Sequence, residues 1–147
     1  MMGRELRTEI LIDAAPDRVW EVLTDKEALG EWNPFIKEMD GELREGERLR
    51  VILQQPNRKP MTIKPRLMEV SPGRELRWLG HLGVPGLFDG EHIFELHPEG
   101  PRSTRFVHRE EFGGLFVPMF WRMLDTDTRE GFEQMNHALK QRAEAAA

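Results

Sequence analysis

The chain contains no cysteine among its 147 residues. This absence excludes disulfide bonds, thiolate catalysis and cysteine-ligated metals. Long apolar runs are also missing, since no segment approaches the roughly 20 consecutive apolar residues of a membrane-spanning helix. The N-terminal sequence MMGRELRTEI has no apolar core of signal-peptide length. We therefore expect a cytoplasmic protein without a membrane span.

The charged residues form no basic block. The net charge is −5, and acidic and basic side chains are intermixed along the chain. Nucleic acids and anionic membrane surfaces attract clusters of Lys and Arg, so neither is expected as a partner. Hydrophobic residues make up 39% and charged residues 32% of the chain, which is typical of a globular domain. A chain of this length predicts one domain, residues 1–147, around one core.

An amphipathic pattern from Leu115 to about Ala143 predicts one long C-terminal helix. Apolar side chains recur on one face at helical spacing: Val117, Phe120, Trp121, Leu124, Phe132, Met135, Ala138 and Leu139. Thr128 and Gly131 lie on the same face, where larger side chains are expected. We therefore expect a cavity between this helix and the layer that covers its apolar face.

The residues before this helix predict strands and turns around two short helices. Residues Glu5–Ile12 alternate as a strand, and helices follow over about Pro16–Leu23 and Lys26–Trp32. Further strands are expected over Phe35–Leu43, Arg48–Gln54, Met61–Val70, Glu75–Leu82, Glu91–His97 and Thr104–Phe112. Their connections are too short for helical crossovers, so the predicted sheet is antiparallel and the fold class is α+β.

Three segments have less regular patterns. Pro65 lies inside the expected strand Met61–Val70 and favours a bulge or a sheet edge there. The Gly-rich segment His81–Gly90 is expected to be a loop that covers a cavity mouth. The segment Leu115–Phe120 is apolar nearly all round and is interpreted as a lid, a contact between subunits or a buried stretch.

Three polar side chains fall among aromatic residues on neighbouring strands. By strand parity His92 shares a face with Phe94, while His108 and Glu110 share a face with Phe112. Such groups can orient a ligand carbonyl or hydroxyl, or act as acid and base, because histidine titrates near neutral pH. A purely structural role stays open, since a core histidine is often hydrogen-bonded to a buried carboxylate.

The histidines do not predict a metal site. His81, His92, His97, His108 and His137 have no short paired spacing of the kind that His ligands show. We expect neither a metal nor another cofactor.

The order of elements and several short motifs resemble a known superfamily. The motifs are Ala15–Leu23, Trp32–Phe35, Gly41, Gly46, Val70–Gly73, Leu76–Trp78, His92–Leu96, His108–Phe112 and Gly131–Asn136. Together they resemble the START-like (SRPBCC) helix-grip superfamily, and most of all its small bacterial polyketide cyclase/dehydrase-like proteins. The resemblance implies a curved antiparallel sheet of about seven strands around the C-terminal helix, with a deep cavity between them. It carries over no catalytic residues, because members bind different molecules.

Three functions follow as alternatives. The leading interpretation is binding of a small, largely hydrophobic molecule (lipid-, polyketide- or aromatic-like). The expected ligand contacts are Trp78, His92, Phe94, Phe106, His108, Glu110, Phe112, Trp121, Leu124, Thr128, Gly131, Phe132 and Met135. The second is a cofactor-independent cyclase, aromatase or dehydratase with His108, Glu110 and His92 as catalytic candidates. The third is a protein-interaction domain of the co-chaperone kind, and the protein is a monomer or a homodimer.

Overall fold

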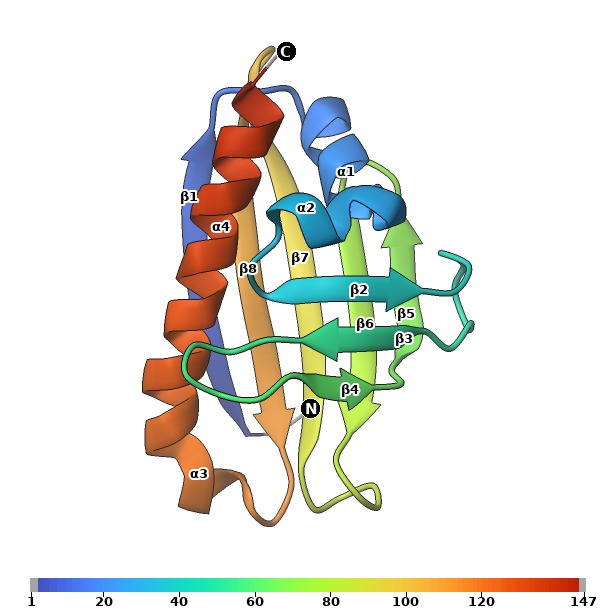
Figure 1. Cartoon of the computed structure of the whole chain (residues 1–147), viewed down its shortest axis with the longest axis vertical. Helices are drawn as coiled ribbons and strands as arrows, with labels where there is room; N and C mark the ends of the chain where they lie inside the picture. The colour runs from blue at the N-terminus through green and yellow to red at the C-terminus, as the bar shows by residue number, and fades with distance from the viewer. Residues whose placement is uncertain (1–2, 146–147) are drawn as a thin grey trace.

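The computed structural model describes residues 3–145 and contains strands, short helices and one long helical run (Figure 1). The elements are β1 (Arg4–Ile12), α1 (Pro16–Thr24), the 3-10 helix η1 (Lys26–Ala28), α2 (Leu29–Trp32), β2 (Ile36–Asp40), β3 (Arg50–Leu53), β4 (Met61–Ile63), β5 (Arg66–Ser71), β6 (Glu75–His81), β7 (Asp89–Gly100), β8 (Ser103–Gly113), α3 (Val117–Met123), the π-helical segment η2 (Leu124–Thr128) and α4 (Arg129–Glu144). The predicted α+β class and the pair of short helices after β1 are confirmed. Within residues 3–145, no helix has the length and apolar character needed to cross a membrane.

The strands form two antiparallel sheets. The larger sheet has the order β1-β8-β7-β6-β5, and the smaller has the order β2-β3-β4. In Figure 1 the small sheet crosses in front of the large one, and α4 runs along the same face beside β1 and β8. The apolar core lies between these layers, and its largest fully buried side chains include Trp78, Phe35, Phe94, Phe106 and Phe132. This arrangement is the helix-grip architecture expected from the sequence.

The segment expected as the single strand Met61–Val70 is two strands in different sheets. β4 pairs with β3, whereas β5 pairs with β6. Pro65 lies between them, where its missing N–H costs no ladder hydrogen bond and its carbonyl accepts from Leu49 N at 2.8 Å. Residues 3–145 therefore form eight strands, close to the expected number of about seven, and these strands are divided between two sheets.

The C-terminal helical run is interrupted at η2. A π turn adds a residue relative to an α turn, and each added residue rotates the following face by about 100°. Side chains of α3 therefore do not all point to the core-facing side on which a continuous α-helix would place them. Phe120 is 42% exposed, and Trp121 is half-buried, with Phe112 at 6.1 Å between ring centroids.

Gly131 lies in a packed interface, so the hollow expected at this position is wrong. A Cβ there would lie 3.0 Å from Cδ1 of Phe35 and 3.4 Å from Cδ of Pro56. The absent side chain makes room for the Phe35 ring, which also packs edge-on against Phe132 at 5.4 Å between ring centroids.

We expect Gly131→Leu to destabilise the protein. Overpacking a filled core costs about 1–3 kcal/mol, and this site lies at the upper end because the Cβ alone is already too close to Phe35. The gain in helix propensity offsets about 1 kcal/mol, which leaves a net loss of about 1–2 kcal/mol in a urea titration. Glu133→Leu, at an exposed position of the same helix, is the control. Equal stabilities of the two variants would show that the interface at Gly131 is hollow.

Candidate functional site

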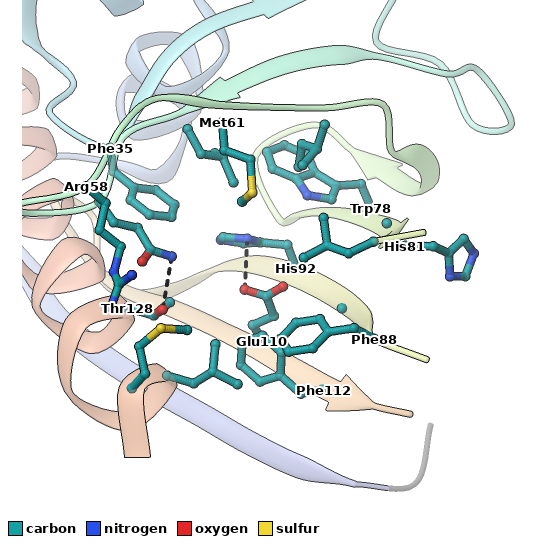
Figure 2. Close-up of a pocket in the computed structure, with 18 of the residues that line it drawn as sticks. Phe35, Arg58, Met61, Trp78, His81, Phe88, His92, Glu110, Phe112 and Thr128 are labelled. Atoms are coloured by element: carbon teal, nitrogen blue, oxygen red, sulfur yellow. Dashed lines mark hydrogen bonds and ion pairs between the residues drawn. The ribbon is translucent and has the colours of Figure 1, made fainter. Parts of the chain in front are cut away.

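A cavity of about 250 Å³ lies between the large sheet, the β3–β4 connection and η2 (Figure 2). Its wall is mainly apolar and comprises Phe35, Leu53, Met61, Ile63, Trp78, Gly80, Leu82, Phe88, Gly90, Phe112, Met123 and Leu124. The polar side chains that line it are Gln55, Arg58, Lys59, His81, His92, Glu110 and Thr128. Arg58, Lys59 and His81 are exposed, whereas His92 is buried and Glu110 is partly buried. The cations therefore lie toward solvent, and the inner polar groups are an imidazole and a carboxyl.

Register on two long strands brings the inner polar groups together. In the antiparallel pairing of β7 with β8, His92 lies opposite Glu110 and Phe94 lies opposite His108. Side chains two residues apart share a face, so all four point from the large sheet toward the core. Gly90 lies beside Glu110, and a Cβ there would come within 2.3 Å of Glu110 Oε2. The missing side chain at Gly90 is the space that the carboxyl occupies.

A chain of polar contacts runs from the cavity wall into the core. Nδ1 of His92 lies 3.5 Å from Oε1 of Glu110. Nε2 of His92 lies 2.7 Å from Nε2 of His108, and Nδ1 of His108 lies 2.9 Å from Oδ1 of Asn136. Asn136 Nδ2 donates to Thr8 Oγ1 at 2.9 Å, and Thr8 Oγ1 donates to the His108 carbonyl at 2.9 Å. The chain therefore connects β7, β8, β1 and α4.

Burial moves the protonation equilibria of three of these groups toward their neutral forms. Removal from water lowers the pKa of His108 from 6.5 to about 3, although its hydrogen bond to Asn136 acts in the opposite direction. Burial lowers the pKa of His92 well below its ordinary value, and repulsion from a protonated His108 lowers it further. Burial raises the pKa of Glu110 from 4.5 to about 8. At neutral pH the cavity therefore contains a carboxylic acid, with two neutral imidazoles behind it.

Part of the predicted ligand-contact set lines the cavity: Trp78, His92, Glu110, Phe112, Leu124 and Thr128. The others do not line it: Phe94, Phe106, His108, Trp121, Gly131, Phe132 and Met135. Most of these lie in a layer behind the wall, because the inner face of the sheet is filled by core packing near α4. His108 is an example, since it is 0% exposed and stacks on Phe132 at 3.9 Å between ring centroids. His108 is therefore placed to support His92, without contact with the cavity.

Some lining residues have no counterpart in the prediction. Phe35 lines the cavity because Asn33 shapes the turn before it: Oδ1 of Asn33 accepts from the backbone N–H groups of Phe35 and Ile36 at 2.9 and 2.8 Å. An Asn before Pro34 is a turn signal in the sequence. Nothing in the sequence indicates that residues of the β3–β4 connection line the cavity.

The β3–β4 connection is attached to η2 by two side-chain contacts. Gln55 Nε2 donates to Thr128 Oγ1 at 3.0 Å, and Arg58 pairs with Asp127 at 2.8 Å. These contacts close the cavity along the side of the helix. Their partners are about 70 positions apart in the chain (73 and 69), so no local pattern predicts them.

Most of the segment Leu115–Phe120 is exposed and only Val117 is buried, so the interpretation as a buried stretch is wrong for the segment as a whole. Leu115 and Met119 are 73% and 74% exposed, and Phe116 and Phe120 are 40% and 42% exposed. Phe120 packs edge-on against Phe88 of the cavity wall at 6.2 Å between ring centroids. The segment is therefore an apolar rim beside the cavity.

Within residues 3–145, no group of three His, Asp or Glu side chains converges in a way that could hold a metal ion. The inner polar groups of the cavity are suited to hydrogen bonding with an organic molecule. They offer one carboxyl and one imidazole, in surroundings of aromatic rings.

Comparisons with known proteins agree with this fold. The Zhui aromatase/cyclase from Streptomyces sp. R1128 superposes with a TM-score of 0.77 at 17% identity, over 96% of this chain and 93% of that chain. A START superfamily protein from Mycobacterium smegmatis superposes with a TM-score of 0.77 at 21% identity, over 99% of this chain and 100% of that chain. At these identities the similarity shows the fold alone.

Similarity in sequence is local among curated proteins and extensive for a family. A stretch of 39 residues is 49% identical to the mitochondrial steroidogenic acute regulatory protein of Rattus norvegicus, and it spans 26% of this chain but only 14% of that protein. The family model described as polyketide cyclase / dehydrase and lipid transport matches residues 4–144. Since that match extends over nearly the whole chain, the protein belongs to this family of START-like domains.

Proposed function

We propose that the protein binds a small, largely hydrophobic molecule in the cavity between the large sheet and η2. The observation that carries the proposal is a mainly apolar cavity of about 250 Å³ with a partly buried carboxyl in its wall. Ligand sites have this composition, with extensive apolar walls for affinity and few polar groups for orientation. Membership in a family whose description includes lipid transport supports the same conclusion.

The proposed ligand contacts are the predicted residues that line the cavity, together with Phe35 and Phe88. Trp78 and Phe35 supply large aromatic faces, and Thr128 supplies a small side chain next to Leu124. Phe94, Phe106, His108, Phe132 and Met135 are proposed to support this wall from behind. Gly131 contributes by accommodating Phe35, which it allows to pack close to α4.

Blocking the cavity at Thr128 is expected to abolish binding of a lipophilic dye. The probe is N-phenyl-1-naphthylamine, whose fluorescence rises in an apolar site. Thr128→Trp places an indole in the cavity, because Thr128 is 2% exposed and lines the wall. Thr126→Trp is the matched control, since Thr126 is exposed and lies two positions away in the same segment. We expect saturable binding by the wild type and by Thr126→Trp, and a loss of at least about tenfold in affinity with Thr128→Trp, which is about 1.4 kcal/mol. Equal dye binding by all three proteins would refute the proposal.

A second candidate function is proton transfer to a bound substrate. The observation that favours it is the carboxyl of Glu110, which is protonated at neutral pH and lies against the cavity. His92 is a poor proton acceptor in this setting because burial lowers its pKa. In this alternative Glu110 would act alone as the acid, with its proton on the oxygen that faces the substrate and not on the one that faces His92, and His108 would have no contact with the substrate. If a substrate is identified, loss of turnover in Glu110→Gln with unchanged binding supports catalysis, whereas full turnover excludes it.

A further inference from the structure

Thr8 determines the direction of every hydrogen bond in the polar chain. A backbone carbonyl only accepts, so the single hydroxyl proton of Thr8 is donated to the carbonyl of His108. Thr8 Oγ1 therefore accepts its contact with Asn136, which must turn its amide nitrogen toward Thr8. The amide oxygen of Asn136 then faces Nδ1 of His108 and accepts from it. This order gives Thr8 Oγ1, both polar atoms of the Asn136 amide and Nδ1 of His108 at least one hydrogen-bond partner each.

The same reasoning fixes which nitrogen donates and which accepts in His108 and then in His92, at the cavity wall. A neutral histidine has one N–H donor and one acceptor nitrogen, so a proton on Nδ1 of His108 makes its Nε2 an acceptor. Nε2 of His92, 2.7 Å away, is then the donor. The remaining nitrogen of His92, Nδ1, has a lone pair and faces Oε1 of Glu110 at 3.5 Å. Figure 2 shows this last contact at the cavity wall.

The proton of Glu110 is therefore held on Oε1. A proton on Oε2 would leave lone pairs of Oε1 and of His92 Nδ1 facing each other, which is unfavourable in a site with little water. Oε2 then has only lone pairs, and the contact of the carboxyl with His92 is made through the other oxygen, Oε1. It lies beside Gly90, which also lines the cavity. Oε2 is thus an acceptor without a partner in an aromatic-lined cavity.

We infer that the ligand presents a hydroxyl group to Oε2 of Glu110, which makes it a hydrophobic alcohol or phenol. This inference rests on the proposed binding function and specifies the ligand class. A hydroxyl proton pairs with the lone pairs of Oε2, whereas a ketone or ether would direct its own lone pairs at them. His92 is a positioning residue here, because it orients the carboxyl without contacting the hydroxyl.

The test is equilibrium dialysis with three naphthalenes of similar size at pH 6.5. 2-Naphthol offers a hydroxyl, 2-methoxynaphthalene offers only an acceptor, and 2-ethylnaphthalene offers neither. A net neutral hydrogen bond contributes about 0.5–1.5 kcal/mol, so we expect 2-naphthol to bind about three- to tenfold more tightly than both others. The ether and the hydrocarbon are expected to bind equally.

Two variants locate the effect. Glu110→Gln should retain the preference for 2-naphthol, because the amide nitrogen can donate to His92 while the amide oxygen accepts from the ligand. Glu110→Leu should remove the preference and leave the affinity for 2-ethylnaphthalene unchanged or higher. The comparison of the three compounds with the wild-type protein decides the question even if the Leu variant fails to fold.

The remaining outcomes distinguish failure of the inference from failure of the function. An ether that binds as tightly as 2-naphthol and more tightly than the hydrocarbon would show that Glu110 donates, which overturns the inference. Equal binding of all three compounds overturns the inference and leaves the hydrophobic site intact. Binding of the lipophilic dye without binding of any naphthalene also overturns the inference. Failure of the dye and of all three naphthalenes overturns the proposed function itself.

Discussion

The free energy of unfolding is expected to be greatest near pH 6.5 and to fall on both sides. On the alkaline side the cause is Glu110, whose pKa is raised from 4.5 to about 8 in the folded protein. Between these two pH values the folded protein holds a proton that the unfolded chain has released. Stability therefore falls with rising pH, by about 1.4 kcal/mol per unit and by on the order of 5 kcal/mol across the full interval.

On the acid side the cause is the histidine pair. The pKa of His108 is lowered to about 3 in the folded protein, and that of His92 lies well below its ordinary value of 6.5. Below about pH 6.5 the unfolded chain takes up two protons that the folded protein does not bind, so stability falls as the pH falls. Since two histidines outweigh one carboxyl, the acid decline exceeds the opposite effect of Glu110 between pH 6.5 and 4.5.

Urea titrations from pH 4 to pH 9 measure this profile. Glu110→Gln should remove the decline between pH 6.5 and pH 8 and should make the protein more stable than the wild type at pH 8, by several kcal/mol. Glu133→Gln, at an exposed position of α4, is the control and should retain the wild-type profile. A wild-type stability that stays constant between pH 6.5 and pH 8 would contradict a protonated Glu110.

Asn136→Leu is expected to cost about 2–4 kcal/mol of stability. Asn136 is 3% exposed and joins Thr8 to His108. Its loss leaves the Nδ1–H of His108 and a lone pair of Thr8 buried without partners, and each such group costs about 1–3 kcal/mol. Gln134→Leu replaces an exposed amide on the same helix and should change the stability by no more than about 0.5 kcal/mol.

A double-mutant cycle shows whether this cost comes from the chain of hydrogen bonds. Thr8→Val should destabilise the wild type, and it should cost less in the Asn136→Leu background because the contact is already lost. Additive effects, or an Asn136→Leu variant as stable as Gln134→Leu, would show that the polar chain contributes nothing to stability.

The parts of the site that depend on local pattern are predictable from the sequence. Alternation on β7 and β8 places His92 and Glu110 on one face, and the short turn between the strands sets the register that pairs them. The long amphipathic helix is visible in the same way. Which side chains of that helix face the core cannot be predicted from the sequence, because the π turn at η2 rotates α3 and places Phe120 at the surface.

The parts that depend on contacts between distant segments are not predictable in this way. Thr8 and Asn136 are 128 positions apart, and neither has a local pattern that marks it as a partner of His108. The small sheet covers the cavity because the chain passes from one sheet to the other at Pro65. The alternating pattern of Met61–Val70 gives no sign of this change, since it reads as one continuous strand. In the sequence, Gly131 suggests a void on the helix face. In the folded protein the ring of Phe35 fills that space.

The central claim is that the cavity holds a neutral carboxyl as its inner polar group. A carbon-13 NMR titration of the glutamate side-chain carboxyls tests it most directly, with the Glu110 signal assigned by its absence in Glu110→Gln. We predict a titration midpoint near pH 8 for Glu110. A midpoint near 4.5 would mean that the carboxyl is ionised at neutral pH, and it would contradict the neutral Glu110 from which the hydrogen-bond direction at His92 follows.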